Sequence, residues 1–175
     1  MDEVYIVKPD ISMAEEIEAY RREMLDEGSS MDGTGELRSI ETAAEWLAKI
    51  ALYERAETLP EGKVMATLFV CIRRSDGRLV GMIQVRHTLN DYLAAFGGHI
   101  GYSVRPSERR KGYASAMLRD VLPYCRGLGL DRVLVTCVEE NTGSRRTIEK
   151  NGGIYENSAV DPTDGESMRR YWISL

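Results

Sequence analysis

The sequence predicts a mixed α/β (α+β) fold, with about six or seven strands in one sheet flanked by about four helices. Two observations support this fold class. Strand-like and helix-like apolar patterns alternate along the 175 residues, and the run 133–138 is apolar enough for a central strand buried on both faces. No linker or internal repeat divides the chain, which is long enough to bury a substantial core. Residues 1–175 are therefore expected to form a single domain.

The chain is expected to begin with a short strand and a helix. Residues Val4–Val7 are β-branched or aromatic and are soon followed by Pro9, a pattern typical of a strand that stops there. Ser12 and Glu15 have the spacing of a capping box, which predicts that a helix begins at this point. Gly28 is expected to end that helix.

A polar loop and a second helix follow. The loop 29–35 contains serine, aspartate, threonine and two glycines. It is either a mobile connection or the wall of a binding site, because loops between early helices often carry binding residues. The pattern over 39–57 predicts a helix whose core face is formed by Trp46, Leu47, Ile50 and Ala51.

Beyond this helix the apolar pattern changes to that of strands. The runs 64–73 and 79–87 flank Asp76-Gly77, a strong signal for a β-hairpin. A further strand-like run over 98–104 contains Gly98 and Gly101, which indicate a bulge or a close approach of another backbone.

The second half of the chain is expected to alternate helices and strands. An apolar stripe at helical spacing after Gly112 predicts a helix packed against the sheet, which Pro123 is expected to bend. The central strand comes next, followed by a short helix over 141–150. Two strands at 154–155 and 168–175 are expected to complete the sheet.

The composition excludes several functions. A net charge of −5 argues against a nucleic-acid partner, which needs a basic face. No apolar run approaches the roughly 18 residues of a membrane span, and the N-terminus lacks the segments of a signal peptide. We therefore expect a cytoplasmic protein with no membrane partner. Cys71, Cys125 and Cys137 lack the spacing of a metal site and are expected to be buried thiols, so no metal is expected.

The hexapeptide Arg109-Arg110-Lys111-Gly112-Tyr113-Ala114 predicts an anion-binding turn. It follows Arg105-Pro106, which stops a strand, and it opens a helix. Gly112 lets the backbone approach a ligand closely, and the first amides of a helix have no partner within it. These amides, the helix dipole and the three cationic side chains would together hold a phosphate or pyrophosphate. The alternative is a basic turn that faces solvent.

This motif and its context resemble a known family. The pattern R-x-x-G-x-A lies between a strand and a helix, and a second apolar strand then leads to Asn141-x-x-Ser144 and a short helix that ends at Lys150-Asn151-Gly152-Gly153. This order is similar to the core of the GNAT (Gcn5-related) N-acetyltransferases over residues 97–157. The resemblance implies a mixed, mostly antiparallel sheet that is splayed between its fourth and fifth strands. It also implies an acyl-CoA-dependent N-acyltransferase whose acyl donor is acetyl-CoA.

The resemblance also implies which residues bind the cofactor acetyl-CoA. The backbone from Tyr102 to Val104 would pair with the pantetheine arm, and Asn141 would contact the same arm, with Ser144 one turn further on. Asn141 could instead be a plain helix N-cap, and it could also serve in both roles. The pyrophosphate would be bound by amides of a loop braced by Arg109, namely those of Arg110, Lys111, Gly112, Tyr113 and Ala114.

The chain departs from the family at the proton donor for the leaving thiolate. Many members carry a tyrosine seven residues after the asparagine, and this chain has Ile148 there. Tyr155, Tyr113 or a water molecule could protonate the thiolate, or it could leave unprotonated.

His99 is the candidate catalytic residue. It lies on the fourth strand, where many relatives have an acidic residue, and imidazole titrates in the range needed to accept a proton from an ammonium group. The alternative is a strand histidine bonded to a backbone carbonyl. If His99 is the base, His99→Ala will lower acyl transfer much more than cofactor affinity.

The sequence thus predicts transfer of an acetyl group from acetyl-CoA to a primary amine of a small molecule or peptide by direct attack, with positioning as the main catalytic device. The alternatives are a catalytically weak acyl-CoA-binding module and a transferase for a longer acyl chain. A nucleotide-binding domain is disfavoured because G-x-G-x-x-G after the first strand is absent. Edge strands near the end of the chain could pair in a homodimer.

Overall fold

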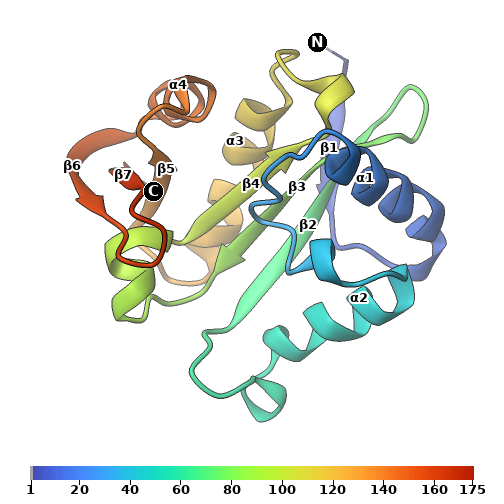
Figure 1. The fold of residues 1–175 in the computed structure, drawn as a ribbon, viewed down its shortest axis with the longest axis horizontal. Helices are drawn as coiled ribbons and strands as arrows, with labels where there is room; N and C mark the ends of the chain where they lie inside the picture. Colours follow the sequence, from blue (N-terminus) through green and yellow to red (C-terminus); the bar gives the residue numbers. More distant parts are fainter. Residues whose placement is uncertain (1) are drawn as a thin grey trace.

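The computed structural model describes residues 2–175, in which seven strands form one sheet with helices on both faces (Figure 1). The strand order is β1-β2-β3-β4-β5-β7-β6. The strands are β1 (Val4–Val7), β2 (Ala66–Arg73), β3 (Leu79–Arg86), β4 (Ile100–Val104), β5 (Arg132–Val138), β6 (Ile154–Val160) and β7 (Ser167–Ser174). The α-helices are α1 (Ala14–Asp26), α2 (Ala43–Ala51), α3 (Tyr113–Gly127) and α4 (Thr142–Lys150).

The centre of the sheet is splayed. Every neighbouring pair of strands is antiparallel except β4 and β5, which are parallel. These two strands share a single register pair, Ile100 opposite Val135, whereas β3 and β4 share five. The mixed, mostly antiparallel sheet and the splay between its fourth and fifth strands are therefore confirmed.

Each face of the sheet has its own core. On one face, α1 and α2 contribute Tyr20 and Trp46, both fully buried, to a cluster over β2 and β3. On the other face, α3 and α4 contribute Met117 and Ile148 to a larger cluster that includes β5. Figure 1 shows the two helix pairs on opposite sides of the sheet. Because both faces are covered, the inner strands read as nearly continuous apolar runs.

Both early helices begin later than the sequence suggested. The amide of Ser12 donates to Asp10 Oδ1 over 2.8 Å, so Asp10 caps a short 3-10 turn and α1 starts only at Ala14. The predicted capping box at Ser12 is therefore wrong. The second helix is also shorter than 39–57, because Thr42 is its N-cap and 3-10 turns replace the α-helix after Ala51. Ala51 is exposed, contrary to its predicted place on the core face.

The other predicted elements lie where they were expected. The β2–β3 hairpin turns at Asp76-Gly77, where Gly77 has φ of +72°. Helix α3 runs without interruption through Pro123, which is exposed. The three cysteines are buried free thiols. Strand β6 is longer than predicted because it is an edge strand paired only with β7, so most of its side chains face solvent and leave little apolar pattern.

No α-helix in residues 2–175 combines the length and apolarity needed to span a lipid bilayer.

Candidate active site

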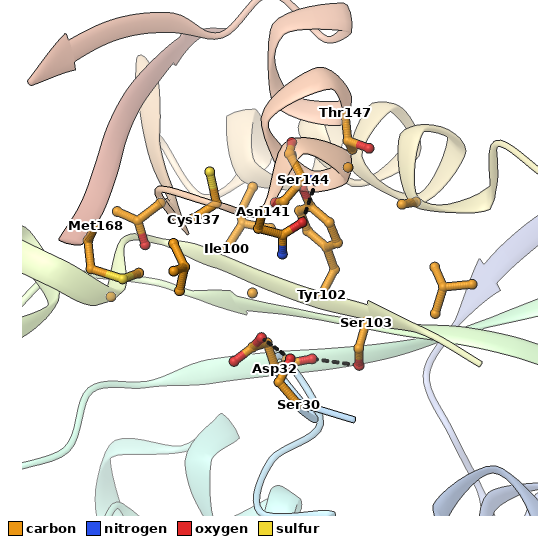
Figure 2. Close-up of a pocket in the computed structure, with 18 of the residues that line it drawn as sticks. Ser30, Asp32, Ile100, Tyr102, Ser103, Cys137, Asn141, Ser144, Thr147 and Met168 are labelled. Carbon is orange, nitrogen blue, oxygen red and sulfur yellow. Dashed lines mark hydrogen bonds between the residues drawn. The ribbon is translucent and has the colours of Figure 1, made fainter. Parts of the chain in front are cut away.

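A cleft of about 1060 Å³ passes through the splay between β4 and β5. Its lining comes from both faces of the sheet: Cys137 and Ser144 lie towards α4, whereas Asp32 and Arg86 lie towards α1 and α2. Figure 2 shows Asp32 and Ser30 on one side of β4 and Asn141, Ser144 and Cys137 on the other. The cleft therefore offers two entrances that meet at the centre of the sheet.

One end of the cleft is a cradle of unpaired amides at the start of α3. The turn before the helix has Arg110 at φ +61° and Gly112 at φ +89°, the left-handed region that glycine adopts without strain. Within the described residues, the main-chain amides of residues 110–115 donate to no acceptor. Consecutive free amides at the positive end of a helix dipole fit the pyrophosphate of an acyl-CoA.

The cationic side chains of the turn do not all converge on the cradle. The Arg109 guanidinium donates to Val104 O over 3.1 Å and to Ser29 Oγ over 2.8 Å, so it ties the turn to β4 and to the loop after α1. Lys111 Nζ pairs with Glu108 over 2.8 Å, and Lys111 does not line the cleft. Arg109 lines the cleft, but its guanidinium is held by these protein contacts, and Lys111 points away, so the three cationic side chains do not converge as expected. The role of Arg109 as a brace for a pyrophosphate-binding loop stays a prediction that these contacts favour.

A buried carboxylate underlies the turn. Glu108, 4% exposed, accepts from Arg73 and Lys111, each over 2.8 Å, and lies 3.4 Å from Arg78. Burial by itself would raise the pKa of this carboxyl, but the Lys111 and Arg73 charges and hydrogen bonds outweigh it and lower the pKa. Glu108 therefore stays ionised and fixes the turn from beneath.

Helix α4 adds two cations that sequence reasoning missed. Arg146 and Lys150 both line the cleft. Their i, i+4 spacing places them on the same face of the helix, and this spacing was the available signal. They place positive charge on the donor side, where the phosphates of a CoA molecule would lie.

The main chain of β4 faces the splay at the predicted positions. The Arg105 amide donates to Val80 O on β3, and the polar groups of successive residues alternate in direction along a strand. The main-chain groups of Tyr102 and Val104 therefore point towards β5, from which β4 has separated. This orientation suits a strand-like contact with a pantetheine arm, although Val104 O already accepts from Arg109.

Asn141 caps α4, and Ser144 contacts the fourth strand. Asn141 Oδ1 accepts from the Ser144 amide over 3.0 Å, which confirms the N-cap role, and Asn141 also lines the cleft. The Tyr102 hydroxyl and Ser144 Oγ lie 2.8 Å apart (Figure 2). Burial raises the pKa of Tyr102, so its phenol is neutral and carries a proton near pH 7.

The two tyrosines suggested as substitutes for the missing acid are less well placed. Tyr113 lines the cleft, but it is buried in the core, and its hydroxyl lies 3.4 Å from Asp2 and 3.5 Å from Arg73. Tyr155 is on the edge strand β6, bonded to Ser158, and does not line the cleft. Ile148, at the position of the family's tyrosine, is fully buried in the core.

The contacts of His99 argue against the catalytic role expected for it. Its Nδ1 accepts from the Leu134 amide over 2.9 Å, it is 5% exposed, and it is not among the residues that line the cleft. Burial and the nearby charge of Arg86 lower the pKa of His99 to about 4. These contacts match a histidine that orders the junction of β4 and β5. The alternative given above had the ring bonded to a backbone carbonyl, whereas here the ring accepts from a backbone amide.

The loop 29–35 forms a wall of the cleft. Of the two interpretations given above, a mobile connection or the wall of a binding site, this position agrees with the second. Ser29, Ser30, Asp32 and Gly33 all line the cleft. The sequence identified this loop without singling out Asp32, because no motif marks that residue.

The family model described as an acetyltransferase (GNAT) domain matches residues 12–154 of the chain. The fold and the cleft agree with this match, and the chain belongs to the GNAT family of acetyltransferases. The resemblance inferred from the sequence is therefore confirmed, and with it the class of acyl-CoA-dependent acetyltransferase.

In sequence, the chain is similar to the uncharacterized N-acetyltransferase YnaD of Bacillus subtilis (strain 168), with 33% identity over 91 residues. The aligned segment spans 50% of this chain and about half (49%) of the relative.

Solved structures share the fold along nearly the whole chain. Mycobacterium smegmatis RimJ, in complex with a CoA disulfide, has a TM-score of 0.70 at 21% identity and covers 98% of this chain and 82% of its own. The microcin C7 self-immunity acetyltransferase MccE, in complex with acetyl-CoA and AMP, has a TM-score of 0.69 at 15% identity, covering 100% and 94%. RimL, an alpha-N-protein acetyltransferase of a ribosomal protein in complex with coenzyme A, has a TM-score of 0.69 at 15% identity, covering 98% and 94%.

Proposed function

We propose that this protein transfers the acetyl group of acetyl-CoA to a primary amine of a small molecule or peptide by direct attack. The observation that carries the proposal is the cleft that joins the amide cradle to the opposite face of the sheet through the splay. A CoA molecule whose pyrophosphate lies on the cradle would place its thioester in the splay, where an amine can reach it from the other side.

The chain's own groups supply positioning and one proton donor. An acceptor ammonium loses one proton to water, and the free amine forms a bond to the thioester carbonyl carbon. The carbon–sulfur bond then breaks, and the Ser144–Tyr102 hydroxyl pair gives one proton to the departing thiolate. The nitrogen loses its second proton to solvent as the amide forms, and the hydroxyl pair takes back one proton from solvent, so that the products are the amide and the free thiol of CoA. We assign this pair the role of the missing tyrosine, because both residues line the cleft beside the splay.

The proposal predicts turnover that depends on this pair. The protein is mixed with acetyl-CoA and a panel of primary amines and peptides. The free thiol of the released CoA is measured with a colorimetric thiol reagent, and the acetylated product is identified by mass spectrometry. Tyr102→Phe should lower kcat on the order of 10- to 100-fold with little change in acetyl-CoA affinity. An unchanged kcat would remove the hydroxyl pair from the mechanism, and CoA binding without turnover of any amine would favour a binding module.

The acyl chain and the size of the acceptor follow from the same panel. RimL acts on a protein and YnaD is named an N-acetyltransferase, so peptides and small amines are both included. Donors with longer acyl chains test whether the cleft accepts more than acetyl. If the transfer rate increases with acyl length, a longer acyl-CoA would replace acetyl-CoA as the proposed donor.

A further inference from the structure

Asp32 lies where the cleft meets a second cavity. This second cavity, of about 540 Å³, opens on the α1 and α2 face of the sheet and is lined by Gln84, Tyr53 and Lys63, among others. Asp32 and Arg86 line both cavities. A volume of this size suits a small molecule or the first residues of a peptide.

The backbone at Asp32 is fixed against β4. Ser103 Oγ donates to Asp32 O over 2.7 Å, and Ser103 is itself 2.9 Å from the buried Tyr20 hydroxyl. The next residue, Gly33, packs so closely on Gly101 that a Cβ at Gly33 would lie 2.1 Å from Gly101 O. The loop therefore rests directly on the strand that borders the splay, and the Asp32 side chain is held near the reaction site (Figure 2).

The Asp32 carboxylate is available to a ligand. Within the described residues its one side-chain contact is a hydrogen bond from Ser30 Oγ to Oδ2 over 2.9 Å, and it takes part in no ion pair. The neighbouring Arg86 instead donates through Nη1 to the carbonyls of Gly97 and Gly98. Oδ1 therefore accepts no hydrogen bond from any residue that the structure describes, and Asp32 lines the cleft to which the proposed function assigns acetyl transfer.

The position of Asp32 has the polarity that the reaction needs. Arg146, Lys150 and the amide cradle make the donor end positive, on the α3 and α4 side of β4. Asp32 places a negative charge on the opposite side of β4, where its carbonyl oxygen accepts from Ser103. An ammonium bound to Asp32 approaches the splay from the face opposite to CoA.

We infer that Asp32 is the residue that binds the acceptor ammonium, and that the body of the acceptor occupies the second cavity. The inference rests on the proposed function. It names the substrate class as a cationic primary amine on a small polar body, including a peptide N-terminus. Asp32 orients the nitrogen; the departing proton goes to water in the cavity, and the amine attacks the thioester from the bound position.

The test uses CoA derivatives, so it does not depend on knowing the acceptor. In one probe, the sulfur of CoA carries a carboxamidomethyl group whose amide nitrogen bears a three-carbon chain ending in an ammonium group. The matched control is the same molecule with a methyl group in place of the ammonium. Binding of each is measured by calorimetry to the wild type, Asp32→Asn and Asp26→Asn. Asp26 is an exposed carboxylate at the end of α1 that lines neither cavity, so its substitution is the matched control.

The wild type and Asp26→Asn should prefer the ammonium probe by about tenfold at low salt, and the preference should shrink as salt is added. Asp32→Asn should bind both probes equally while retaining affinity for acetyl-CoA. A preference that persists in Asp32→Asn, or that is absent from the wild type, overturns the inference and leaves the proposed function intact. Failure of both probes and of acetyl-CoA to bind would reject the proposed function itself.

Discussion

At the scale of single residues, the contacts of His99 favour a structural role over the catalytic one expected from the sequence. Its Nδ1 accepts from Leu134, and the single register pair between β4 and β5 lies next to it. Burial and the charge of Arg86 lower the pKa of His99 to about 4, so near pH 7 the imidazole is neutral, the form in which Nδ1 can accept this hydrogen bond.

This contact predicts an acid-sensitive fold. Between the ordinary pKa of about 6.5 and the folded value of about 4, the unfolded chain binds a proton at His99 and the folded chain does not, so stability falls as pH falls through this window. From about pH 7.5 to pH 5 the loss due to His99 should be about 2 kcal/mol. Urea unfolding at both pH values measures it.

His99→Asn is the informative variant, because an amide oxygen can accept from Leu134 without titrating. It should lose less stability than the wild type between the two pH values and keep most of its acetyl transfer. Two results would contradict the structural role. One is an equal pH dependence of the free energy of unfolding in both proteins, and the other is loss of most of the acetyl-transfer rate in His99→Asn.

Single residues also mark the limit of sequence reasoning. Asn141 could be predicted as a cap because Ser144 lies three residues away, and capping is a local interaction. The Tyr102–Ser144 hydroxyl pair and the contact of Ser103 with Asp32 join residues 42 and 71 positions apart. Such contacts depend on how the sheet and the loop fold together, so no spacing in the sequence reveals them.

At the scale of elements, the turn before α3 depends on the ion pairs around Glu108. Arg73 comes from β2, Arg78 from the hairpin loop just before β3, and Lys111 from the turn itself. Arg110 in the turn has a positive φ without being glycine, a conformation that needs support from its surroundings.

Glu108→Gln should therefore weaken both stability and acetyl-CoA binding. Arg73, whose side chain is 12% exposed, would lose the charge of a buried partner but keep its hydrogen bonds to Asp76, so the cost should be about 1–3 kcal/mol. The free energy of unfolding and the dissociation constant of acetyl-CoA are measured together. Glu41→Gln, at an exposed site, is the control, and a Glu108→Gln protein with wild-type affinity would show that the turn holds its shape alone.

The elements differ in how well the sequence predicts them. The hairpin and the central strand have strong local signals, Asp76-Gly77 and a continuous apolar run, and both were placed correctly. The start of α1 was misplaced because Asp10 competes with Ser12 for the capping role. The second helix was made too long because the pattern beyond Ala51 continues as 3-10 turns, which share nearly the same periodicity.

At the scale of the whole molecule, the splay between β4 and β5 turns a covered sheet into a cleft with two entrances. The strand count followed from the apolar patterns, but the splay followed only from the resemblance to a family. Separation of two strands is a property of the assembled sheet, and neither strand contains a residue pattern that reports it. In the proposed function, acyl-CoA would use the edge that the splay exposes, and the amide cradle at one end of the cleft would set its orientation.

The most direct test of this account is thermal unfolding with and without acetyl-CoA at about 100 times its dissociation constant, for the wild type, Gly112→Glu and Gly129→Glu. Gly112 and Gly129 have φ of +89° and +85° at opposite ends of α3, so both variants carry similar backbone strain, and only Gly112→Glu places a negative charge in the cradle. Ligand should contribute roughly 2.7 kcal/mol, or on the order of 5 to 10 °C, to the wild type and to Gly129→Glu. The account predicts that this shift disappears in Gly112→Glu; an equal shift in all three proteins, or none in the wild type, would contradict it.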